Sequence, residues 1–101
     1  MIVIITTLHQ KQSALSIGRG LLNERLIACY NLWPVESAYW WKGELLEENE
    51  TILIMKTKDK NFEAVRKFIK EKSGYEVPEV ISLSTKEVDK SYLDWVNTET
   101  K

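Results

Sequence analysis

The stretch ACYNLWPVESAYWWKGELLEENETILIMKT, residues 28–57, decides the fold of this chain. Residues 28–41 alternate between two faces as a β-strand does, and Pro34 within them indicates an edge position or a bulge. Lys42-Gly43 forms a turn, because glycine readily takes positive φ. Residues 45–57 return as a second strand, so the stretch predicts one long β-hairpin.

The arms of this hairpin are long for a small protein. Strands usually have about 5–6 residues, and at about 3.3 Å per residue these arms extend beyond any helices packed on them. The chain also has four Trp and four Tyr, each with roughly 150–250 Å² of surface to bury. We therefore expect another copy of the chain to cover the overhang by pairing at the strand edges.

A strand and a helix precede the hairpin. Residues 2–7 are a β-branched run bounded by polar residues, which predicts a buried strand. Residues 10–26 carry apolar side chains at helical spacing. Gly18 and Gly20 lie within this helix, where each costs about 1 kcal/mol relative to Ala, so we expect them to allow close packing on the sheet.

A helix, a strand and a short final helix follow the hairpin. Asp59 is the predicted N-cap of a helix that runs to about Lys72 and is terminated by Gly74. Residues 79–84 are predicted as the fourth strand. A capping-box pattern predicts that the last helix opens at Ser91.

The order β-α-β-β-α-β with a terminal helix predicts an α+β fold, a ferredoxin-like sandwich in which two helices cover one face of an antiparallel sheet. Residues 1–101 are interpreted as a single domain. The 14 basic and 15 acidic residues give no basic excess, so we expect no nucleic-acid partner. No apolar run approaches the ~20 residues of a membrane span. The single cysteine, Cys29, favours a reducing cytoplasm.

Charge is unevenly distributed along the chain. Residues 36–50 contain five acids and one base, whereas residues 56–72 contain seven bases and three acids. These segments are either two solvated faces or an acidic hairpin that docks near the basic helix of a neighbouring subunit.

Standard catalytic and metal-binding motifs are absent. The chain has no phosphate-binding glycine loop and no GxSxG motif, and one His with one Cys is a poor basis for a nucleophile–base pair. We expect no enzymatic activity. Thiolate or imidazole metal sites need three or four ligands, so we expect no cofactor and no dedicated metal site. His9 is interpreted as a plain solvated residue. Any Cu²⁺ or Zn²⁺ would bind weakly, through surface carboxylates or His9.

Several segments together resemble the CutA family, the divalent-cation tolerance proteins. They are ERLIACYN at 24–31, SxYxWxG at 37–43, YEVPEV at 75–80 and YLDWV at 92–96. The resemblance spans the chain and implies a ferredoxin-like homotrimer with a likeness to PII-type signalling trimers. It also implies a role in tolerance of copper and other divalent cations, without an established reaction.

The chain departs from the family at residues linked to soft metals. Many members carry His before the tyrosine of the YExPE segment, where this chain has Ser73-Gly74. Some carry Cys at the end of the first strand, where this chain has Thr6-Thr7. A soft-metal site built on those side chains is therefore not carried over.

The resemblance suggests small-ligand clefts between subunits. Their predicted lining is Cys29, Asn31, Trp41, Glu50, Lys56, Tyr75 and Glu76. The same residues could instead only build the trimer. A further alternative is an enzyme acting on a small anion, with Lys56 as electrophile and Glu76 or Glu50 as the acid–base group. An RNA-recognition module is disfavoured, because the third strand lacks the aromatic residues that stack bases.

Overall fold

The computed structural model describes residues 1–101 and confirms the predicted order of elements. The elements are β1 (Ile2–Leu8), α1 (Lys11–Asn23), β2 (Cys29–Trp41), β3 (Glu44–Thr57), a 3₁₀ turn (Asp59–Asn61), α2 (Phe62–Ser73), β4 (Ile81–Ser84) and α3 (Lys90–Glu99). No helix is long and apolar enough to cross a membrane.

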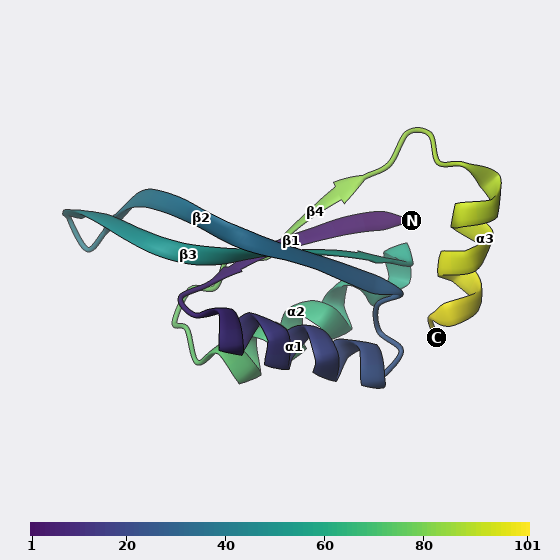
Figure 1. The fold of residues 1–101 in the computed structure, drawn as a ribbon, viewed down its shortest axis with the longest axis horizontal. Coiled ribbons are helices and arrows are strands. Elements are labelled where there is room, and N and C mark those ends of the chain that lie inside the picture. The colour runs from purple at the N-terminus through teal and green to yellow at the C-terminus, as the bar shows by residue number, and fades with distance from the viewer.

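The four strands form one antiparallel sheet in the order β2-β3-β1-β4. Helices α1 and α2 lie on the same face of this sheet, and α3 lies near the N-terminus (Figure 1). This arrangement is the predicted ferredoxin-like sandwich, with an additional C-terminal helix.

The core lies between the sheet and its two covering helices. Alternate residues of β1 and β3 face the helices, and Ile4, Leu53 and Met55 are fully buried there. They meet Leu21 of α1 and Ile69 of α2 within one apolar cluster. Burial of each such side chain contributes about 1.5–3 kcal/mol, so this layer holds the sheet on which the hairpin is built.

The hairpin extends well beyond the rest of the sheet. Strand β1 ends at Leu8, which pairs with Thr51, so residues 44–50 of β3 have only β2 as a neighbour. Figure 1 shows this part projecting past the helices, along the 45 Å long axis of the molecule. Lys42 and Gly43 close the turn with φ values of 50° and 82°. The predicted overhang is therefore confirmed.

The two helical glycines mark points of close approach. A Cβ atom on Gly18 would lie 2.9 Å from the Tyr30 ring, and one on Gly20 would lie 2.6 Å from the Phe68 ring. The predicted close packing is confirmed, although Gly20 meets α2 rather than the sheet. Pro34 lies on the edge strand β2, whose pairing with β3 is continuous and shows no bulge.

Two predicted boundaries near the first and second helices are wrong. The helix predicted over residues 10–26 ends at Asn23, because Arg25 takes a positive φ of 58° and redirects the chain. Asp59 does not cap α2. Its carboxylate instead lies 2.9 Å from the N-terminal ammonium of Met1, and an ion pair there competes with the capping role.

Two boundaries near the C-terminus also differ from the prediction. The last helix is capped by Asp89 rather than Ser91, since the Asp89 carboxylate accepts a hydrogen bond from the Tyr92 backbone N–H at 3.3 Å. The strand predicted over residues 79–84 begins only at Ile81, where pairing with β1 starts.

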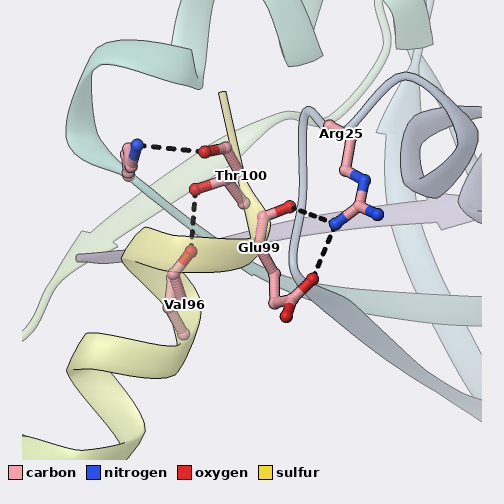
Figure 2. A network of polar contacts seen from close by, with 5 residues as sticks. Arg25, Val96, Glu99 and Thr100 are labelled. Atoms are coloured by element: carbon pink, nitrogen blue, oxygen red, sulfur yellow. Dashed lines mark hydrogen bonds and ion pairs between the residues drawn. The ribbon is translucent and has the colours of Figure 1, made fainter.

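The connector around Arg25 ties α3 to the rest of the molecule (Figure 2). The Arg25 guanidinium donates to the Glu99 carboxylate at 2.6 Å. The Thr100 hydroxyl donates to the Val96 carbonyl at 2.8 Å, and Lys58 Nζ donates to the Thr100 carbonyl at 3.0 Å. The contacts of Arg25 and Lys58 fix the end of α3 against the α1–β2 connector and against the segment that follows β3.

The sheet face opposite the helices has no covering layer within the subunit. Trp33, Ile81 and Leu83 lie on this face and are 44%, 47% and 50% exposed. Trp40, on the overhang, is 72% exposed. The core of one subunit therefore does not bury all of the large apolar side chains.

Candidate functional site

A cavity of about 850 Å³ lies at the base of the overhanging hairpin. The end of β1, both arms of the hairpin and the loop after α2 contribute to its wall. The lining residues are Thr7, His9, Glu36, Ser37, Ala38, Tyr39, Trp40, Trp41, Leu46, Glu48, Glu50, Tyr75, Glu76, Val77 and Glu79. Four of the seven predicted site residues, Trp41, Glu50, Tyr75 and Glu76, are among them.

The loop after α2 is shaped so that Tyr75 reaches the end of β1. Gly74 ends the helix in the left-handed conformation, with φ of 72°. The Tyr75 hydroxyl oxygen then accepts a hydrogen bond from the His9 backbone N–H at 2.6 Å. The two rings also meet edge to face, with centroids 4.9 Å apart. Lys70 Nζ donates to the carbonyls of Tyr75 and Glu76 and holds the loop in place.

Two carboxylates of β3 face the His9 side chain. Glu48 and Glu50 are two residues apart and therefore share a face of the strand. His9 Nδ1 lies 3.2 Å from Glu48 Oε2 and 3.7 Å from Glu50 Oε2. The Glu50 side chain is only 9% exposed, and neither carboxylate forms an ion pair with Lys or Arg. Within one subunit, the nearly buried Glu50 carboxylate therefore has the His9 imidazole as its only basic neighbour.

Burial, hydrogen bonds and this negative charge raise the pKa values of neighbouring side chains. Tyr39 donates its hydroxyl to Glu48 Oε2 at 2.7 Å, and this hydrogen bond, with desolvation and the carboxylate charges, raises the pKa of Tyr39 to about 12. Burial, followed by the charge of Glu50, raises the pKa of the Glu79 carboxyl. Burial also raises the pKa of Tyr75. The cavity therefore has a negative electrostatic potential, which suits a cation.

The other three predicted residues lie together at the end of the hairpin that is farthest from the Lys42-Gly43 turn. Cys29 pairs with Lys56 across the two strands, and Lys56 Nζ donates to Asn31 Oδ1. The Cys29 thiol lies 3.5 Å from the Tyr92 hydroxyl of α3, and this contact is the main reason that the pKa of Tyr92 is raised to about 12.

Within one subunit, the predicted residues therefore form two separate groups. Lys56 follows Glu50 by six residues of strand, which corresponds to roughly 20 Å. The lysine that approaches the cavity acids is Lys42, whose Nζ lies 3.9 Å from Glu76 Oε2. A cleft that contains all seven residues requires a second subunit, and its existence stays a prediction.

Sequence reasoning missed two polar side chains of the cavity, Tyr39 and Glu48, and it treated His9 as a solvated residue outside the predicted cleft. His9 is 49% exposed, so its solvent exposure agrees with the expectation, but its two carboxylate neighbours were not foreseen. The spacing of Glu48 and Glu50 indicates a shared face. Their meeting with His9 depends on the pairing of Leu8 with Thr51, which no local pattern specifies.

The fold and the site together define the class of protein: a small ferredoxin-like α+β subunit with an overhanging hairpin and an acidic cavity at its base. The model of the family described as "CutA1 divalent ion tolerance protein" matches residues 2–99. The chain belongs to this family.

Individual relatives are similar over their full length. The divalent-cation tolerance protein CutA of Pyrococcus horikoshii is 40% identical over 101 residues, which cover 100% of this chain and 99% of that protein. The crystal structure of CutA1 from the same organism superposes with a TM-score of 0.95 at 39% identity, covering 100% and 99% of the two chains.

Two further solved structures have the same fold. The periplasmic divalent cation tolerance protein CutA of Archaeoglobus fulgidus gives a TM-score of 0.97 at 29% identity, with 100% of both chains covered. The PII-like protein CutA of Nostoc sp. PCC 7120 gives 0.93 at 35% identity, covering 100% of this chain and 98% of that one. These likenesses confirm the family resemblance and the ferredoxin-like fold.

Proposed function

We propose that this protein acts as a non-enzymatic homotrimer in the response to divalent cations, copper included, and holds small ligands at the hairpin cavity. The observation that carries the proposal is the cavity itself, in which Glu50 is 9% exposed and has no Lys or Arg partner within its own subunit. A site of this charge attracts cations, and the names of the relatives link them to divalent-cation tolerance.

The uncovered surface supports assembly into a homotrimer. Trp33, Ile81 and Leu83 leave apolar area on the open sheet face, and the hairpin presents free strand edges beyond Leu8. Both features are unfavourable in an isolated subunit. The acidic hairpin and the basic helix α2 provide the charge complementarity that would orient one subunit on the next.

Within one subunit Lys56 lies apart from the acidic cavity. The alternative, an enzyme acting on a small anion, therefore requires Lys56 of one subunit to approach Glu50 or Glu76 of another. We place the protein in the cytoplasm, because its single thiol suits a reducing compartment.

Two measurements test this proposal. Light scattering on the purified protein should give three times the 11.8 kDa subunit mass, and a monomer mass would contradict the assembly. A strain that lacks the protein should grow more poorly than its parent under Cu²⁺ or Zn²⁺ challenge and recover when the protein is restored. Equal growth of the two strains across metal concentrations would remove the tolerance role.

A further inference from the structure

We propose that His9, Glu48 and Glu50 bind one divalent transition-metal ion in each subunit, with Cu²⁺ or Zn²⁺ preferred over Mg²⁺ and Ca²⁺. This inference deepens the proposed function and rests on it for its biological role. The binding itself is a property of one subunit and is measured independently.

The geometry of the three side chains suits a small metal ion. Their ligand atoms all lie within 4.8 Å of one another. Tetrahedral zinc with bonds of about 2.0–2.1 Å places its ligand atoms about 3.3 Å apart, and the distances from His9 Nδ1 to the two carboxylate oxygens are 3.2 and 3.7 Å. Small rotations of the His9 and Glu48 side chains, which are 49% and 34% exposed, would bring the ligand atoms closer around an ion.

Burial and charge provide a second, independent argument. Glu50 keeps only 9% of its side chain exposed, in a wall that also contains the Glu79 carboxyl. Removing carboxylates from water without a cation is unfavourable. A dication between Glu48 and Glu50 offsets this repulsion, and Glu79 or water is available for the remaining position.

Neighbouring groups already orient the ligands. Tyr39 donates a hydrogen bond to Glu48 at 2.7 Å, and Tyr75 holds the His9 backbone and packs against its ring. Such outer partners fix ligand direction in metal sites and typically change affinity about 10–100-fold when removed. The His9 imidazole nitrogen favours Cu²⁺ or Zn²⁺ at this site, since Mg²⁺ and Ca²⁺ favour oxygen ligands alone.

The test is calorimetric titration of the purified protein with Zn²⁺ and Cu²⁺, and with Mg²⁺ for comparison. Native protein should bind one Zn²⁺ or Cu²⁺ per chain. His9→Ala and Glu50→Gln should weaken the binding by about 100-fold or more, and Tyr39→Phe by about tenfold. Glu47→Gln is the matched control, because Glu47 lies on the same strand but faces the other way. Glu47→Gln and Cys29→Ala should bind as the native protein does.

Three results would overturn the site. They are an absence of saturable binding, binding that survives His9→Ala, or binding that is lost in Cys29→Ala. Each variant is also checked for mass by light scattering and for growth under metal challenge. Loss of binding with unchanged mass supports the site, because it separates ligand removal from unfolding. Failure to bind in a protein that still forms trimers and supports tolerance refutes this site alone.

Discussion

Replacing Glu50 with Gln should stabilise the metal-free protein. In the native chain Glu48 and Glu50 have ligand atoms within 4.8 Å of each other and no Lys or Arg between them. Coulomb repulsion of two unit charges at that distance is about 0.9 kcal/mol in bulk water and about 3.5 kcal/mol at an effective dielectric constant of 20. Since Glu48 is 34% exposed and solvent screens it, we expect a gain of about 1 kcal/mol.

The assay is urea unfolding at one fixed protein concentration and one fixed pH, in the presence of a chelator. Glu50→Gln should raise the free energy of unfolding, whereas the control Glu47→Gln should stay within about 0.5 kcal/mol of native. With zinc present, the native protein should become more stable than Glu50→Gln. At 100 times the dissociation constant, the native protein gains about 2.7 kcal/mol and the variant gains far less.

A destabilised Glu50→Gln protein in chelator would refute the reasoning. That outcome would mean that neighbouring groups satisfy the buried carboxylate without a cation, so the cavity would not select for one. An equal gain from zinc in both proteins would place the bound metal elsewhere.

Three further predictions follow from local geometry. Gly20→Ala should lower the free energy of unfolding by about 1 kcal/mol. The new Cβ would lie 2.6 Å from the Phe68 ring, and this clash costs about 1–3 kcal/mol, which exceeds the gain in helix propensity of about 1 kcal/mol. An increase in the free energy of unfolding would show that the ring moves freely. Phenolate absorbance should place the Tyr39 titration at about 12, moving toward about 10 in Glu48→Gln. Because its folded pKa is the higher one, the contribution of Tyr39 to stability is complete below about pH 10 and is lost as pH rises through the folded value; an unshifted midpoint in the variant would contradict the hydrogen bond. The Cys29 thiol should react slowly with thiol reagents in the native assembly, since the Cys29 side chain lies on the sheet face that neighbouring subunits are proposed to cover. Reaction at the rate of a free thiol would contradict that burial.

Much of the fold follows from short-range pattern in the sequence. The turn at Lys42-Gly43, the length of the hairpin and the packing role of Gly18 all follow from alternation, turn chemistry and the cost of glycine in a helix. One boundary was wrong because a long-range contact overrides a local preference. Asp59 is a good capping residue, but it pairs with the N-terminal amine instead.

The candidate site was less predictable for a related reason. Trp41, Glu50, Tyr75 and Glu76 were identified and do share a cavity, whereas Lys56 lies at the far end of the hairpin. His9 was dismissed because a single imidazole cannot form a metal site alone. Its carboxylate partners lie about 40 residues away in sequence, and only the register of β1 with β3 brings them together.

Anomalous diffraction from crystals soaked in zinc tests most directly whether the hairpin cavity is a divalent-cation site. We expect one peak per subunit, within about 2.0–2.2 Å of His9 Nδ1 and of one oxygen each from Glu48 and Glu50. A peak at Cys29, or no peak in the cavity at a zinc concentration that saturates the calorimetric signal, would contradict this account.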